Sequence, residues 1–188
     1  MRKIKGFKLN LKPKEIQRRA KKIKLDLAAQ GLGSEEKFGE ILTRFSQSSS
    51  ASVVYDSFPA ETSPLSPLPG LAFSLGLVTL GPGPGELAEE VSRTSPNPSE
   101  SRLLLNLIAQ SALDDATRFV LGLIEEEAKE EHCQLSPLQL LSENPILQAA
   151  VSRLEGHKIG VSVTEEGLKP AHTTAFSLSW LARSRSRA

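Results

Sequence analysis

The stretch LAFSLGLVTLGPGPG, Leu71 to Gly85, decides the fold. Its first ten residues are almost continuously aliphatic, which is typical of a strand buried on both faces of a sheet. The GPGPG that follows is a turn sequence, because glycine permits tight backbone angles and proline cannot continue a strand. We therefore predict a buried strand over 71–80, a turn over 81–85 and then a short helix with an acidic first turn.

Upstream of this strand the sequence predicts two helices and a second strand. Pro13 suits the first position of a helix, and apolar residues follow it at helical spacing until Gly31 and Gly33. Ser34 is the predicted cap of a second amphipathic helix, which should pack against the first. The run 53–58 predicts a short strand, and the prolines between 59 and 69 predict a surface connection.

Downstream, one helix is predicted from about Glu100 to Glu131, long and partly buried. Ser136 with Pro137 has the form of a helix cap followed by a first-turn proline, so we expect two short helices up to Leu154. KIGVSVT (158–164) and TAFSLSWL (174–181) then predict two strands around a turn at 165–167. We expect these closing strands to be antiparallel neighbours. The fold class is mixed α/β.

Bulk composition points to a soluble protein of one compact domain. The chain has 188 residues and a single cysteine, Cys133, which excludes an internal disulfide and fits a reducing cytoplasm. The sequence has neither a signal peptide nor an apolar run long enough to span a membrane, so we expect no membrane contact.

Charge is distributed unevenly along the chain. Residues 1–24 hold eleven Lys or Arg against Glu15 alone, and the basic tail 183–188 adds three arginines. The body between them carries nine basic and 21 acidic residues. One alternative function is therefore that of an interaction module, which would use the basic N-terminal arm to bind RNA or an acidic protein.

The residue patterns of common active sites are incomplete. There is no G-x-S-x-G elbow, and GPGPG lacks the amide donors and the following GK[ST] of a phosphate loop. Asp114 and Asp115 are adjacent on a helix, so their side chains diverge. His132 beside Cys133 has no partner at zinc-ligand spacing, and His157 in E-x-H-x-x-G is an isolated match to a cobalt-ligand pattern. No catalytic residue and no metal site are predicted, so the chain is not expected to be an enzyme by itself.

Three stretches in order resemble the activation domain of cobalamin-dependent methionine synthase and its small stand-alone relatives. GLVTLGPGPGEL (76–87) is similar to that family's V-T-L-G-P-E-L-E. The long helix from Leu103 runs into QLSP (134–137), and HKIGVSVTEEGLKPAHTTAF (157–176) is similar to I-G-V-x-L-T-E-S-x-x-L-x-P-x-x-S-V-S. With VVYDSFP near Val53, the resemblance covers most of 52–180.

The resemblance implies a twisted antiparallel sheet packed with helices, including one long central helix, over residues 52–182. A basic helical arm, residues 1–51, would precede it. It also implies a non-catalytic surface that presents S-adenosylmethionine to the cobalamin of a corrinoid protein or methyltransferase. The implied ligand residues are Gln134, Ser136 and Pro137, with Thr164 and Glu165 expected beside them.

One segment departs from the family pattern. The family's R-x-S-P-G-Y becomes QLSPLQ here, so Gln134 replaces the arginine, Leu138 the glycine and Gln139 the tyrosine. A guanidinium can hold a carboxylate through two charge-assisted hydrogen bonds, and glycine permits close approach of a ligand. We therefore expect S-adenosylmethionine to bind weakly or not at all. Ser136 and Pro137 would equally be explained by the helix start proposed above.

Overall fold

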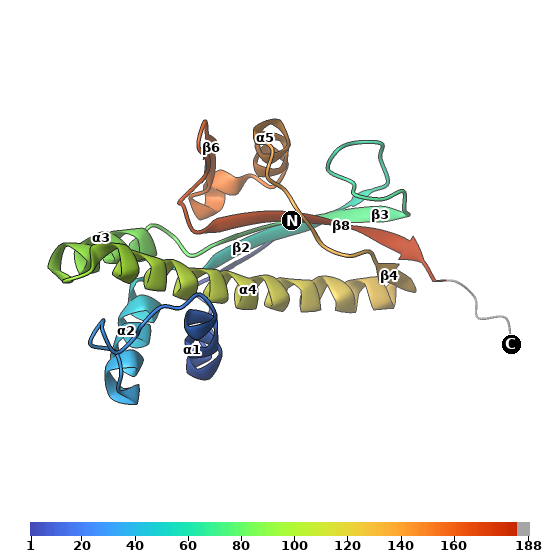
Figure 1. Ribbon diagram of the computed structural model, residues 1–188. Helices are drawn as coiled ribbons and strands as arrows, with labels where there is room; N and C mark the ends of the chain where they lie inside the picture. Colours follow the sequence, from blue (N-terminus) through green and yellow to red (C-terminus); the bar gives the residue numbers. More distant parts are fainter. Residues whose placement is uncertain (184–188) are drawn as a thin grey trace, which may run out of the picture.

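A single antiparallel sheet forms the middle of the protein, with helices on both of its faces (Figure 1). The computed structural model describes residues 1–183. The strand order is β1 (Arg2–Lys5), β2 (Ser52–Pro59), β3 (Ala72–Thr79), β8 (Thr173–Ala182) and β4 (Cys133–Leu135), and β5 (Gln139–Leu140) also pairs with β8. The predicted mixed α/β class, with an antiparallel sheet and one long helix, is confirmed.

Strand β3 lies at the centre, as its continuous apolar sequence predicts. It pairs with β2 on one side, from Ser52 opposite Thr79 to Pro59 opposite Ala72, and with β8 on the other. Gly76 is needed here because the ring of Phe176 lies directly over it, where a Cβ atom would collide. The glycine thus lets a large aromatic side chain pack flat against the middle of the sheet.

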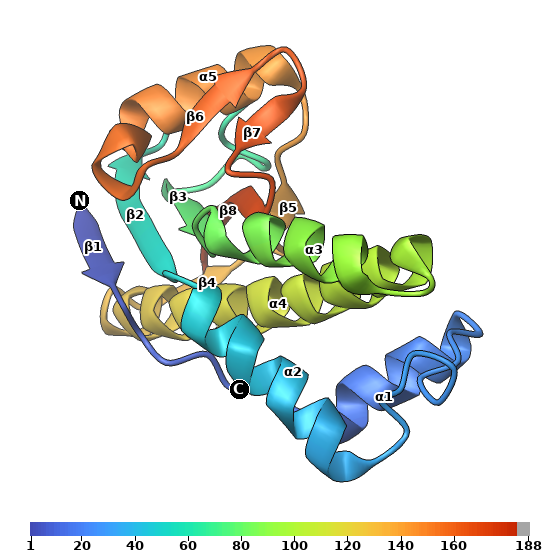
Figure 2. The same ribbon diagram turned by 90° about the vertical axis from the view of Figure 1, so that its left-hand side faces the viewer.

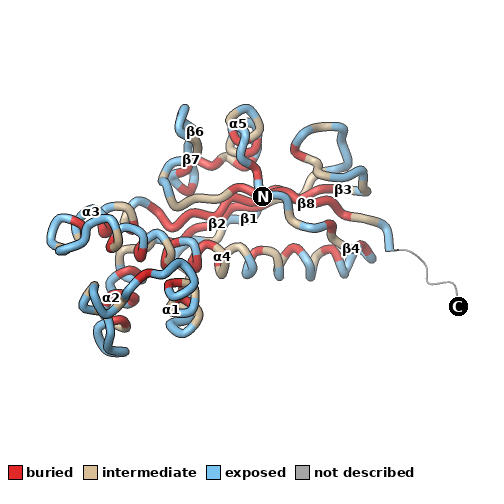
Figure 3. Tube along the Cα trace, in the orientation of Figure 1, coloured by how far each residue is buried: buried red, intermediate tan, exposed pale blue. Residues whose placement is uncertain are grey.

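The helices divide into two layers (Figures 1 and 2). One face of the sheet is covered by α4 (Pro98–Glu130), which packs with α1 (Pro13–Lys22), α2 (Glu35–Ser48) and α3 (Gly83–Thr94). The other face carries α5 (Asn144–Arg153), the short helix η1 (Gly156–Ile159) and the hairpin β6 (Ser162–Thr164) and β7 (Gly167–Lys169). Alternate residues of each strand point into the two cores, and Figure 3 shows burial concentrated where these layers meet the sheet.

The basic N-terminal residues belong to the same packed body. Strand β1 is not predicted from the sequence, yet Arg2–Lys5 pairs with β2 as an edge strand. One apolar cluster contains Ile16 and Ala20 of α1, Phe38 and Phe45 of α2, and residues of α4. The N-terminal helices therefore pack against the rest of the protein across the boundary expected at residue 51. Ser34 caps α2 as predicted, since its hydroxyl accepts a hydrogen bond from the Lys37 amide at 3.3 Å.

Helix boundaries differ from the prediction at two places. Helix α1 ends at Lys22, short of the glycines, because Lys24 adopts a left-handed φ of 59°. Helix α3 begins at Gly83, inside the GPGPG turn, because proline is accepted in the first helical turn.

Two predictions for the C-terminal third are wrong. Ser136 and Pro137 do not start a helix; they lie between β4 and β5, and only one helix, α5, follows before Leu154. The closing strands are not neighbours either, because β6 pairs with β7, whereas β8 pairs along its length with β3. The aliphatic face of β8 is long enough to complete the central sheet, so its burial there outweighs pairing with its nearest neighbour in sequence.

Apart from Arg183, the predicted basic tail lies outside the described residues. Among residues 1–183, no helix combines the length and the apolar character needed to cross a membrane.

Candidate functional site

The segment Cys133–Leu140, which contains the QLSP motif, forms an interrupted edge of the sheet. Leu135 lies opposite Trp180 and Gln139 lies opposite Ser177, so three residues of this segment face only two of β8. One extra residue on a strand is a β-bulge, which locally breaks the ladder of hydrogen bonds. Pro137 suits this place because it has no amide proton to leave unpaired.

Ser136 repairs the ladder at the bulge. Its amide donates to the Ser179 carbonyl at 2.9 Å, and its hydroxyl accepts the Ser179 amide at 2.9 Å. The same hydroxyl donates to the Pro137 carbonyl at 3.1 Å, and Ser136 is 7% exposed. The backbone of the bulge therefore uses both hydrogen-bonding functions of this serine, which leaves its hydroxyl poorly placed to hold a ligand.

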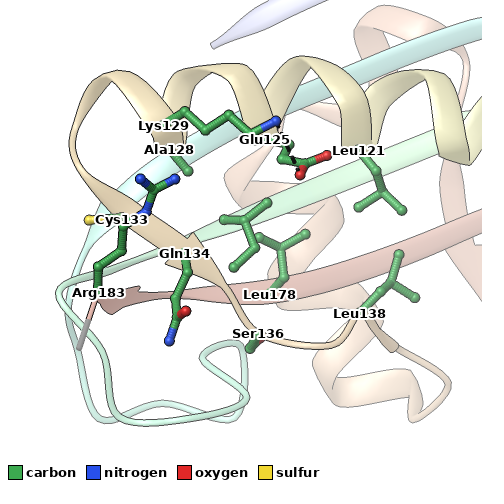
Figure 4. A pocket seen from close by; sticks show the side chains of 11 residues that line it. Leu121, Glu125, Ala128, Lys129, Cys133, Gln134, Ser136, Leu138, Leu178 and Arg183 are labelled. Carbon is green, nitrogen blue, oxygen red and sulfur yellow. Dashed lines mark ion pairs between the residues drawn. The ribbon is translucent and has the colours of Figure 1, made fainter. Parts of the chain in front are cut away.

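A hollow of about 380 Å³ opens between this segment and the C-terminal half of α4 (Figure 4). Gln134, Ser136 and Leu138 line one wall, and Glu125 and Lys129 line the other. The Lys129 ammonium pairs with the Glu125 carboxylate at 3.3 Å, and both side chains are more than half exposed. The lining thus offers apolar surface, a mutually neutralised ion pair and one further cation, the guanidinium of Arg183.

Leu138 also lines a second hollow of about 430 Å³ farther along α4. There Arg19 donates to Asp114 Oδ2 at 2.8 Å and to Glu15 Oε1 at 3.0 Å. The hydrogen bond that Arg19 donates to Asp114, with a smaller contribution from the one to Glu15, raises the pKa of the Arg19 guanidinium. Leu138 is thus a lining residue of both hollows.

The structure does not bring all five expected ligand residues together. Gln134, Ser136 and Pro137 lie at the β4 end of the sheet, whereas Thr164 and Glu165 lie on the β6–β7 hairpin beside α5 (Figure 1). The Thr164 hydroxyl donates to the Gly167 carbonyl at 3.2 Å, and the Asn144 amide group donates to the Glu165 carbonyl at 3.0 Å. The expected cleft between Ser136 and this hairpin is therefore not formed.

Sequence reasoning missed a polar cluster that ties β1 to α4. The buried Tyr55 donates to Glu127 Oε1 at 3.1 Å, and Arg2 pairs with the same carboxylate. Burial raises the pKa of the Tyr55 phenol, and the hydrogen bond with Tyr55 is the main cause that raises the pKa of Arg2. These residues are 53 to 125 positions apart, so no local pattern could have linked them.

Metal-ligand types are dispersed within the part of the chain that the structure describes. No three His, Cys, Asp or Glu side chains of residues 1–183 are grouped so that they could hold an ion. Comparison with known proteins finds no matching family model and no matching curated protein.

Proposed function

We propose that the protein is a non-catalytic binding module that acts beside a corrinoid methyltransferase carried on another chain. Its surface for this role is the hollow between α4 and residues 133–138. The observation that carries the proposal is that QLSP, the segment similar to the family's S-adenosylmethionine motif, forms a wall of a hollow of about 380 Å³. Small-molecule sites commonly have volumes of roughly 300–1,000 Å³.

The proposed ligand affinity is weak, for two reasons that act at the same wall. Gln134 lacks the charged fork that a family arginine would offer to a carboxylate. Leu138 places an aliphatic side chain in the lining of both hollows, where the family pattern has glycine. In the proposed role, this chain contacts a partner whose own domain would carry the cobalamin. The hollow would hold S-adenosylmethionine weakly or not at all.

The support for this proposal is narrower than the full resemblance. The pairing of the closing strands, expected from 157–176, is wrong, so that stretch contributes only its short β6–β7 turn. What remains is the order of three features: the central strand β3 with its turn, the long helix α4, and QLSP directly after it.

Restoring the family residues tests the ligand site. We expect Gln134→Arg with Leu138→Gly to raise the affinity for S-adenosylmethionine by at least about tenfold, because a charge-assisted hydrogen bond contributes about 1.5–3 kcal/mol. Isothermal titration calorimetry measures the change. The matched control is Gln148→Arg with Leu71→Gly, which makes the same chemical changes at exposed positions outside the hollow. A folded double variant with no gain would contradict the site.

The partner is tested separately. Titration with a cobalamin-loaded corrinoid protein, followed through the visible absorbance of the corrinoid, should give a saturable change that Leu138→Glu weakens. An unchanged spectrum across the titration, with chain and corrinoid protein both folded, would overturn the proposed role.

A further inference from the structure

A second groove lies between residues 8–14 and helix α2. It consists of two hollows of about 540 and 520 Å³ that share Asn10, Leu11, Pro13 and Gly39. Figure 1 places α2 near the start of α4 and β4 near its end, so this groove is separate from the hollow beside Gln134. The inference below is independent of the function proposed above.

The wall formed by residues 8–14 is fixed by the rest of the fold. Leu9 is 9% exposed and packs in the core that α4 covers. The Asn10 amide donates to Asp115 Oδ2 at 3.2 Å, which ties the segment to α4. The groove is thus preformed and needs no ordering of its wall when a partner binds.

Gly39 marks the floor of the groove. It lies inside α2, where glycine is less favourable than alanine, and a Cβ atom there would meet no other atom of this chain within 4 Å. This contrasts with Gly76, where the Phe176 ring requires a glycine. The fold itself therefore gives no steric reason for a glycine at 39, and Gly122 in α4 is open in the same way.

The groove combines an apolar floor with a basic rim. Its floor includes Leu11, Phe38 and Leu42, and its rim carries the exposed side chains of Lys8, Lys12 and Lys14. Glu35 is the one acidic residue that lines it. Of the eleven Lys and Arg residues before Leu25, only Arg2 and Arg19 take part in the ion pairs formed among residues 1–183. The three rim lysines are consequently free to meet an outside anion.

We propose that this groove binds an acidic segment of a partner protein that carries apolar side chains along one face. The apolar side chains would enter the two hollows while the carboxylates meet the rim lysines. Single-stranded nucleic acid fits less well because its bases stack on exposed aromatic rings. Phe38 is only 1% exposed, and Phe7 is already stacked on Phe119 at 5.4 Å between ring centroids.

The test uses the full chain and a fluorescein-labelled acidic peptide with leucine at every third or fourth position. Fluorescence anisotropy should show saturable binding that falls by roughly tenfold when the leucines are replaced by serine, or when Lys12→Glu and Lys14→Glu are combined. Gly39→Leu should weaken binding by a similar factor, because its side chain extends into open space and fills the floor.

Matched controls separate the groove from general charge and from general helix effects. Lys21→Glu with Lys22→Glu makes the same change of charge on exposed residues of α1 outside the groove, and Gly122→Leu alters a second open helical glycine, in α4. Both should leave the affinity within about twofold. The proposal is overturned if the controls weaken binding as much as the groove variants, if labelled single-stranded RNA binds more tightly than the peptide, or if the peptide does not bind.

Discussion

The hollow beside β4 and the groove beside α2 differ in what their polar groups do. At the β4 end, the fold already uses the polar side chain of the QLSP segment, because the Ser136 hydroxyl holds the bulge together. At the α2 end there is no motif, yet lysines line an apolar floor without ion pairs among residues 1–183. A short sequence motif can therefore serve the backbone, whereas a groove with a basic rim can form from two segments that share no motif.

Among the stability changes expected here, the largest is at Ser136. Ser136→Ala removes the acceptor of the buried Ser179 amide, which should lower the free energy of unfolding by about 1–3 kcal/mol. Urea denaturation measures the loss, and Ser162→Ala, at an exposed strand position, is the control that should change little. An unchanged unfolding midpoint for Ser136→Ala would mean that the serine does not serve the bulge.

A smaller change in stability, of opposite sign, is expected at Gly39. Gly39→Ala should raise the free energy of unfolding by about 0.5–1 kcal/mol, because alanine favours the helix and its Cβ atom meets open space. Thermal denaturation measures the gain, and Gly122→Ala should give a similar one. Gly76→Ala is the opposing control and should destabilise by about 1–3 kcal/mol, because its Cβ would collide with Phe176. Destabilisation by Gly39→Ala would show that the fold itself requires this glycine.

The sequence was informative where one local pattern decides a structure. Strand β3, helix α4 and the Ser34 cap follow from continuous apolar character, from helical length without breakers, and from side-chain capping. It failed where distant segments compete. Pro137 has the same local chemistry in a helix start and in a bulge, and only the presence of β8 beside it selects the bulge.

The candidate site was predictable to a similar degree. Gln134, Ser136 and Pro137 could be singled out because they form a short continuous motif, and they line or adjoin one hollow. The prediction that Thr164 and Glu165 lie at the same site uses only their order in the chain. That order does not determine on which face of the sheet a hairpin lies. The α2 groove depends on packing between residues 8–14 and 35–47, which the composition of either segment does not reveal.

We propose that an acidic partner segment binds at Gly39, on a surface distinct from the hollow beside residues 133–138 that is proposed for the corrinoid partner. Amide chemical-shift mapping of the ¹⁵N-labelled protein with the acidic leucine peptide tests it most directly. Shifts are expected at residues 8–14 and 35–47 alone, with the amides of 133–140 unmoved. Shifts centred on 133–140, or a spectrum that the peptide leaves unchanged, would contradict it.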